Sequence, residues 1–265
     1  EALEDAYGVT PPPLGRTIRE LLLLGQIIQN QATSVFLFTM PDRLGTASMF
    51  EPMEGVGSPQ DRAVLATRAL KVRRVGTDLI SLTGGQFIHP VKATVGGVTS
   101  GVAPEPAAEM RQQIREALPI ACELFDRYWE TSFVLRDRIG TWGDDGPAHY
   151  ITATGETCPN YDGLPGQDVI RVLSPKGVCC EAFYARDFRD VLTFEETDYS
   201  YAGRTSYDGE VMRANSLARI NMTRSLGTPR ADEYLSRFRE AFGQPAHAIL
   251  LFDLCRGIEL VYALE

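Results

Sequence analysis

The feature that most constrains the fold is a long apolar segment near the start of the chain. Residues 17–40, TIRELLLLGQIIQNQATSVFLFTM, read as a helix, and Leu21–Met40 carries no charge over about the length that spans a bilayer. Amide side chains nevertheless occupy its middle, at Gln26, Gln29, Asn30 and Gln31. Hydrocarbon accepts such groups only at a cost. The pattern therefore predicts a core helix without a transmembrane role, which ends at Pro41–Asp42 and whose amides find partners inside the protein.

Proline and glycine mark the ends of two further predicted helices. Ser58 is a suitable N-cap, Pro59 fits the first helical position, and Gly84 suits the C-terminal end. A longer apolar stripe then extends over residues 104–138, where we expect Pro119 to bend the helix. Helices of this length usually form the spine of a bundle.

The composition changes after this helical region. The next part is rich in Gly, Asp, Thr and Tyr and contains the β-like runs HYITATG, DVIRVL and EAFYA, which predict a small antiparallel subdomain. Helical patterns return at Thr228–Pro229, end at Gly243 and resume near Pro245. We therefore expect a mainly α protein with a β-rich insertion (α+β), built as a long-helix bundle. The expected divisions of this single domain, 1–265, are a helical core at 1–139, a β-rich subdomain at 140–222 and closing helices at 223–265.

Charge and cysteine usage narrow the function classes. The 265 residues carry a formal net charge of −9, which argues against a nucleic-acid-binding surface. Five cysteines are scattered without a C-x-x-C pair, as is typical of reduced thiols in the cytoplasm, and adjacent Cys179 and Cys180 are expected to be small side chains in a strand. Because the chain starts at Glu1 and its last helix lacks an end signal, we expect a fragment of a longer protein.

Common catalytic motifs are absent from the sequence. It has no G-x-G-x-x-G after a strand, no P-loop and no G-x-S-x-G elbow. The histidines His89, His149 and His247 lie far apart without ligand-spaced neighbours, so the sequence predicts no metal site. Arg219 lies in an apolar context and needs carbonyls, an anion or a carboxylate as a partner, of which we favour a structural ion pair.

His89 lies in a stretch with unusual backbone requirements, TGGQFIHPVKATVGGVTSG. Pro90 favours extended backbone at His89, and the glycine pairs on either side allow close approach to another backbone or to a cofactor. A histidine in a turn is more often a structural hydrogen-bonding residue than a catalyst. Our hypothesis is that this loop packs closely near a buried cofactor, with the His89 side chain directed toward the core.

Four stretches in order carry a family resemblance: PPPLGRTIRELLLLGQIIQNQATSVFLFTMPD, the loop around His89, DYSYAGRTSYDGEVMRANSLARIN, and the closing GTPRADEYLSRFREAFGQPAHAILLFDLCRGIELVYALE. Together they resemble the large subunit of nickel–iron hydrogenases, most closely the cytosolic branch coupled to NAD(P) or a deazaflavin. The resemblance covers nearly the whole chain. It implies nickel held by four cysteines in two C-x-x-C pairs, two of them bridging to an Fe(CO)(CN)2 unit. This chain has neither pair, so the resemblance implies that it binds no metal by itself and is inactive alone.

The resemblance also assigns scaffold positions around the metal centre. His89 matches the family's turn histidine, Asp42 its Pro-Asp, and Arg219 its L-A-R arginine. The family's S-H-x-x-H motif is replaced here at Asn30, Gln31 and Ser34, and a family lysine by Gly203. Gln31 can hydrogen-bond but, unlike histidine, cannot relay a proton by titrating.

The expected function of the complete protein is reversible H2 oxidation, with electrons passed to an iron–sulfur small subunit, and in the NAD(P)-coupled branch to a diaphorase module. An alternative is a metal-free homologue that serves as a structural or quinone-site subunit of a complex-I-like assembly, which the missing histidines and lysine favour. A helical interaction domain is a third reading, which the ordered set of matches opposes.

Overall fold

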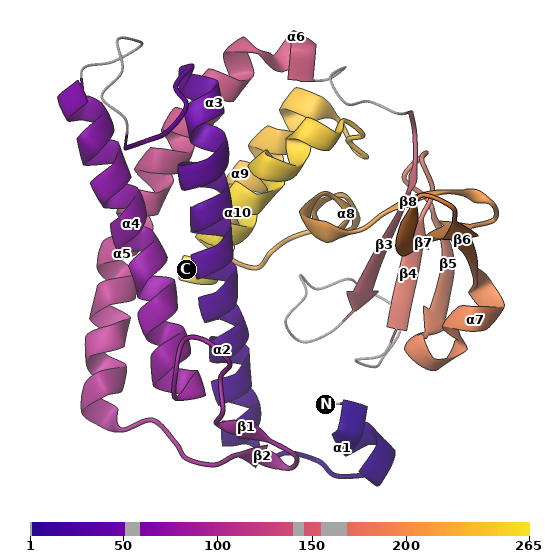
Figure 1. Cartoon of the computed structure of the whole chain (residues 1–265), viewed down its shortest axis with the longest axis horizontal. Coiled ribbons are helices and arrows are strands. Elements are labelled where there is room, and N and C mark those ends of the chain that lie inside the picture. Colours follow the sequence, from indigo (N-terminus) through magenta and orange to yellow (C-terminus); the bar gives the residue numbers. More distant parts are fainter. Residues whose placement is uncertain (1, 51–58, 140–145, 155–168) are drawn as a thin grey trace. The chain divides into compact units, whose positions relative to one another are not determined.

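The computed structural model describes residues 2–50, 59–139, 146–154 and 169–265, which form two compact units (Figure 1). The first unit comprises Glu1–Phe133 and Glu259–Glu265, and the second comprises Val134–Ile258. The fold is mainly helical with one larger sheet, which confirms the predicted α+β class. The predicted division at residues 139 and 222 stays a prediction.

The first unit is a bundle of long helices in which α2, α4 and α5 run side by side (Figure 1). A short β-hairpin follows α4. The elements of this unit are α1 (Ala2–Tyr7), α2 (Pro13–Ala32), a π-helical segment (Thr33–Thr39), α3 (Met40–Leu44), α4 (Pro59–Gly84), β1 (Ala93–Thr94), β2 (Gly97–Val98) and α5 (Pro104–Val134).

The predicted apolar helix begins earlier and ends later than expected. It starts at Pro13, becomes π-helical over Thr33–Thr39, and continues through Pro41 as α3 to Leu44. The prediction that Pro41–Asp42 ends it is wrong. Proline is tolerated in the first turn of a helical segment, where its missing N–H breaks no bond, and the change of hydrogen-bond register puts Pro41 in such a turn. The helix instead ends at Gly45, whose φ of 67° is left-handed.

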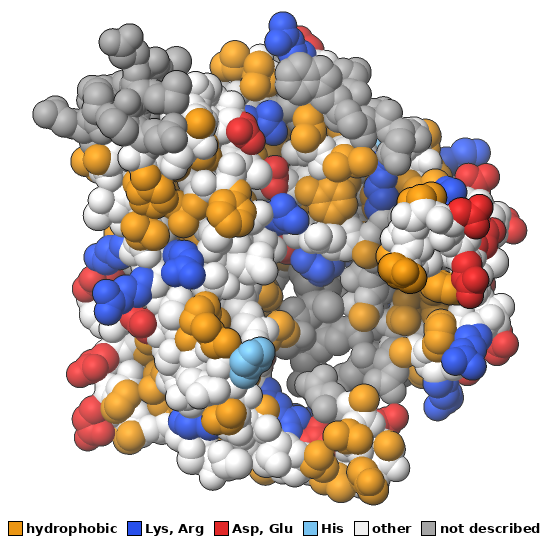
Figure 2. All heavy atoms as spheres, viewed as in Figure 1, with side chains coloured by type: hydrophobic (Ala, Val, Ile, Leu, Met, Phe, Trp, Pro, Cys, Tyr) orange, Lys and Arg blue, Asp and Glu red, His pale blue; other side chains and the backbone are white. Residues whose placement is uncertain are grey.

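Pro13–Leu44 as a whole is long and apolar enough to cross a membrane, judged by length and composition, a property that core helices of soluble proteins share. One side of it is buried, through Ile18, Ile28, Ala32, Val35, Phe36 and Met40. Leu14 and Phe38 are exposed. Figure 2 shows hydrophobic side chains in small groups among basic and acidic ones on the face that it draws.

Two glycines allow the backbones of α2 and α4 to approach each other closely. A β-carbon on Gly76 would lie 2.5 Å from the Gln29 nitrogen and 2.8 Å from the Gly25 oxygen. Gly25 meets the Ile80 nitrogen and the Gly76 oxygen from the other side. The crossing of these helices therefore depends on the absence of side chains at both positions.

The second unit contains a six-stranded sheet in the order β5-β4-β3-β8-β7-β6. The three predicted runs correspond to β3, β4 and β5, but the prediction of a purely antiparallel sheet is wrong, because β3 and β8 pair in parallel. The elements of this unit are α6 (Arg136–Ile139), β3 (His149–Thr154), β4 (Val169–Leu173), β5 (Cys179–Tyr184), a 3-10 turn (Ala185–Asp187), α7 (Phe188–Val191), β6 (Leu192–Thr197), β7 (Ser200–Tyr207), β8 (Glu210–Arg213), α8 (Asn215–Met222), α9 (Pro229–Phe242), a second 3-10 turn (Ile249–Leu251) and α10 (Phe252–Leu264), whose last residues belong to the first unit.

The helix termini agree with their sequence signals in most places. Thr228 precedes α9 and Gly243 ends it, as predicted. The predicted cap Ser58 lies outside the described residues. The last helix, predicted from near Pro245, begins only at Phe252. Ala246 is held in a non-helical connection by the buried Asn221 side chain, which donates to its carbonyl and accepts from its N–H.

Candidate functional site

The glycine-rich loop is tied to the N-terminal helices by one buried ion pair. Arg19 of α2 donates through Nη1 and Nη2 to the two Glu4 carboxylate oxygens, at 2.7 and 2.6 Å. The same guanidinium donates to the Gly97 carbonyl, and the Gly96 N–H donates to Glu4 Oε1 at 2.7 Å. This clamp therefore joins α1, α2 and the β1–β2 hairpin.

The clamp changes the titration of its carboxylate. Hydrogen bonds from Arg19 lower the pKa of Glu4 from 4.5 to about 2, although burial opposes the shift, and the Gly96 N–H contributes further. Glu4 is only 4% exposed. No local sequence signal marks this pair, because the two residues are separated by an ordinary loop and neither belongs to a recognisable motif.

A pH dependence follows from the lowered pKa of Glu4. The carboxylate form is favoured by folding, so its stabilising contribution is complete above the ordinary pKa of 4.5 and is lost as the pH falls toward about 2. We expect the free energy of unfolding of Glu4→Gln to fall less over this acid window than that of the wild type, measured by denaturant titration at several pH values. Glu109→Gln, at an exposed carboxylate of α5, should behave as the wild type. Parallel acid profiles for wild type and Glu4→Gln would contradict the assignment.

The loop around His89 packs closely against backbone, one of the two partners predicted for its glycines. Gly15 of α2 faces Gly97, to which an added β-carbon would lie at 3.2 Å, and Gly84 similarly faces Pro90 at 2.7 Å. The Val91 and Lys92 N–H groups donate to the Gly84 carbonyl at 2.9 and 3.0 Å. The loop thus folds back onto the end of α4.

His89 itself does not adopt the predicted geometry. Its φ is 53°, in the left-handed region, and its side chain is exposed, so the predictions of extended backbone and a core-facing imidazole are both wrong. The chain must reverse at this point for Pro90 to reach Gly84, and histidine is among the residues that tolerate left-handed backbone. Gln86 Nε2 donates to the His89 carbonyl at 2.8 Å, which supports the turn.

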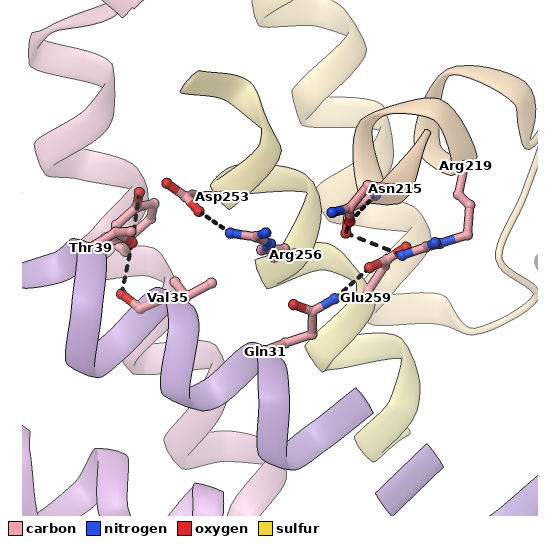
Figure 3. Close-up of polar contacts among 10 residues, drawn as sticks. Gln31, Val35, Thr39, Asn215, Arg219, Asp253, Arg256 and Glu259 are labelled. Carbon is pink, nitrogen blue, oxygen red and sulfur yellow. Dashed lines mark hydrogen bonds and ion pairs between the residues drawn. The ribbon is translucent and has the colours of Figure 1, made fainter. Parts of the chain in front are cut away.

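The amide-rich middle of α2 provides the most buried polar contact of the first unit. Gln31 Nε2 donates to Glu259 Oε2 at 2.7 Å, and these side chains are 7% and 5% exposed (Figure 3). Gln29 Nε2 contacts Thr33 Oγ1 at 3.3 Å. The predicted need for internal partners is thus confirmed for Gln31 and Gln29, whereas Gln26 and Asn30 are exposed.

The π-helical segment lies directly beyond Gln31. Within it, Thr39 Oγ1 donates to the Val35 carbonyl at 3.2 Å and lies 3.4 Å from the Tyr128 hydroxyl of α5 (Figure 3). Short π segments inside α-helices are frequent at functional sites. Glu259 and the π segment were missed by the sequence analysis, because neither has a local signal. The predicted Asp42 follows this segment, and its side chain is exposed.

Arg219 belongs to the second unit, on α8. Its Nη2 donates to Ser216 Oγ at 3.2 Å, and Ser216 donates through N and Oγ to Asn215 Oδ1 (Figure 3). Asn215 has a φ of 76°, a left-handed conformation that asparagine adopts more easily than most residues. On α10, Arg256 forms an ion pair with Asp253 at 2.9 Å.

The chain's own residues do not form a metal site where the structure describes them. Among the described residues, no group of three or more His, Cys, Asp or Glu side chains could hold a metal ion. The four described cysteines are free, with Cys122 and Cys255 buried and Cys179 and Cys180 exposed. They therefore do not fit a nickel site built on four thiolates.

Three curated relatives align with the whole of this chain. The vhu F420-non-reducing hydrogenase of Methanococcus voltae, in the one of its chains that matches, is 28% identical, with 63% of that chain covered. The alpha chain of sulfhydrogenase 1 from Pyrococcus furiosus is 26% identical, with 56% covered. The beta chain of the NAD-reducing hydrogenase HoxS from Cupriavidus necator is 23% identical, with 57% covered. No protein-family model matches the chain.

Solved structures show the same fold. The crystal structure of an NAD+-reducing nickel–iron hydrogenase in the H2-reduced state superposes with a TM-score of 0.81 at 20% identity, covering 97% of this chain and 58% of that chain. The nickel–iron–selenium hydrogenase from D. vulgaris Hildenborough in the reduced state gives 0.75 at 16% identity, covering 99% and 62%. The predicted resemblance is confirmed, and the chain spans about three fifths of the length of its first relatives.

Proposed function

Because its relatives are hydrogenase large subunits, we propose that this chain is the central part of the large subunit of a nickel–iron hydrogenase, which catalyses reversible H2 oxidation. The observation that carries the proposal is the agreement of two comparisons over the whole chain: 100% coverage in sequence and a TM-score of 0.81 in structure. A fold match alone would not carry the chemistry, since one fold hosts many functions.

We further propose that the chain serves as scaffold and that the metal ligands lie in other parts of the complete protein. The described residues lack a metal-ligating cluster, and the sequence lacks both C-x-x-C pairs that the resemblance implies. When bound, nickel and Fe(CO)(CN)2 would supply the H2 chemistry. This chain's residues would fix the surrounding helices, through the glycine crossing of α2 and α4 and the clamp at Glu4.

Gln31 has the best-supported individual role in this proposal. It stands where the family has a histidine, and its amide donates to the buried Glu259 carboxylate. An amide positions a neighbouring group without titrating, so we propose that Gln31 orients Glu259 and takes no part in proton transfer. Scaffold roles for His89, Asp42 and Arg219 remain predictions, of which His89 is weakened by its exposure.

The relatives also suggest the setting of the complete enzyme. We propose a soluble cytoplasmic heteromer in which electrons pass to an iron–sulfur small subunit. The NAD-reducing relative makes a diaphorase module a reasonable further partner. The relatives and structures compared above are hydrogenases, and nothing in them favours the metal-free, complex-I-like alternative.

The proposal is tested with the complete natural protein and its iron–sulfur partner. We expect H2-dependent reduction of a redox dye, and cysteine pairs in the patterns R-x-C-x-x-C and D-P-C-x-x-C on either side of this region. Matched preparations with a serine in one of these pairs should lose turnover. Serine or glycine at these positions in the natural sequence, together with no H2-dependent reduction, would favour the metal-free alternative.

A further inference from the structure

Two adjacent cysteines occupy a break in the register of the sheet. Cys179 pairs with Leu173, whereas Glu181 pairs with Val172, so Cys180 is the extra residue of a β-bulge. In a regular strand, consecutive side chains point to opposite faces, which would keep neighbouring sulfur atoms apart. The bulge interrupts this alternation, so the geometry no longer forces the two thiols onto opposite faces.

Both thiols are accessible, unlike the other two described cysteines. Cys179 and Cys180 are free and exposed, and Cys122 and Cys255 are free and buried. Cys179 Sγ lies 3.5 Å from the Glu181 carbonyl, and Cys180 Sγ lies 3.3 Å from the Val172 carbonyl. Neither contact covers the sulfur with a bulky side chain.

The surroundings distinguish the two sulfur atoms. Burial raises the pKa of the Cys180 thiol, although a hydrogen bond from the Tyr207 hydroxyl opposes the shift. Cys180 therefore ionises less readily than an ordinary cysteine, and the thiolate is the reactive form. We expect Cys179 to react first and Cys180 to act as its resolving partner.

We propose that Cys179 and Cys180 form a reversible oxidation site for peroxides. The Cys179 thiolate attacks one peroxide oxygen, the O–O bond breaks, and Cys179 sulfenic acid forms with release of one water. The Cys180 sulfur then displaces the hydroxyl group from Cys179, which forms the S–S bond and releases a second water. Two thiols are oxidised and one hydrogen peroxide is reduced to water. This site is independent of the proposed hydrogenase function.

The product is expected to be easily reduced. Adjacent α-carbons are about 3.8 Å apart across a trans peptide, whereas disulfide-linked α-carbons are usually roughly 4.4–6.8 Å apart. The bridge is therefore strained, and strained, exposed disulfides have the more oxidising potentials typical of labile or regulatory bonds. Cellular dithiols would return the pair to its reduced form.

The test uses the complete protein in a Cys158→Ser background, because Cys158 lies outside the described residues. After treatment with equimolar hydrogen peroxide and alkylation of free thiols, the peptide that contains both cysteines is analysed by mass spectrometry. We expect this peptide to escape alkylation, to have lost two hydrogen atoms, and to be restored by dithiothreitol. Cys179→Ser and Cys180→Ser are the matched controls: Cys180→Ser should instead accumulate a sulfenic acid that dimedone traps.

A second measurement tests the geometry without any oxidation. Phenylarsine oxide binds two thiols that can reach the same arsenic atom, so the wild type should bind one equivalent and each serine variant should lose this binding. Alkylation of both cysteines after peroxide treatment, over-oxidation of Cys179 beside a free Cys180, or a disulfide between chains would overturn the proposal. None of these readouts depends on hydrogen turnover, so this proposal and the proposed function can fail separately.

Discussion

Gly76→Ala should destabilise the protein, although alanine is the better helix former. The added methyl group would lie 2.5 Å from the Gln29 nitrogen and 2.8 Å from the Gly25 oxygen, which are backbone atoms and cannot rotate away. Alanine gains about 0.8–1.0 kcal/mol over glycine in a helix, but overpacking of a close contact costs about 1–3 kcal/mol and occasionally more. Because α2 and α4 must move apart, we expect a net loss of about 2 kcal/mol in the free energy of unfolding.

The control for this prediction is Gly101→Ala. Gly101 has no heavy atom within 4 Å of an added β-carbon and does not require left-handed backbone. Its replacement should change the free energy of unfolding by no more than about 0.5 kcal/mol. Both variants are compared with the wild type by denaturant unfolding. If Gly76→Ala were as stable as Gly101→Ala, the close crossing of α2 and α4 would be refuted.

The second large effect is expected from Gln31→Leu. This change removes a donor at 2.7 Å from the buried Glu259 carboxylate, and hydrogen bonds to charged groups contribute about 1.5–3 kcal/mol. We expect a loss of stability in that range. Glu259→Gln should cost less, because the remaining amide carbonyl can still accept from Gln31. The pair can be isolated by measuring both single variants and the double variant in a cycle.

Gln26→Leu is the matched control for Gln31→Leu. Gln26 lies on the same helix but its side chain is exposed, so the same change of residue type should alter stability by no more than about 0.5 kcal/mol. Equal effects at the two positions would show that the loss of an amide from α2, rather than the contact with Glu259, determines the result. A coupling energy near zero in the cycle would lead to the same conclusion.

The helices were predictable where local chemistry determines their ends. Proline at the start and glycine at the end mark α4 and α9, and both helices lie where the sequence places them. The π-helical segment was not predictable, because hydrophobic periodicity does not report the register of backbone hydrogen bonds. For the same reason Pro41 was read as a helix end, although it starts a new turn.

The site depends on contacts that the local sequence does not contain. Gln31 and Glu259 are 228 residues apart, so only the folded chain reveals their hydrogen bond. His89 takes a left-handed conformation because the loop must return to Gly84, a tertiary requirement that outweighs the local preference before Pro90. The absence of a predicted metal site follows from residue types alone, since no C-x-x-C pair is present.

The most direct test of the central claim is the nickel content of the purified complete protein, measured by mass spectrometry in parallel with H2-dependent turnover. If this chain is the scaffold of a nickel–iron hydrogenase, the complete protein should contain nickel in close to equimolar amount, and Gln31→Leu should retain that nickel even where it lowers stability. A complete protein that is folded, free of nickel after maturation in its natural host, and unable to oxidise H2 would contradict the claim.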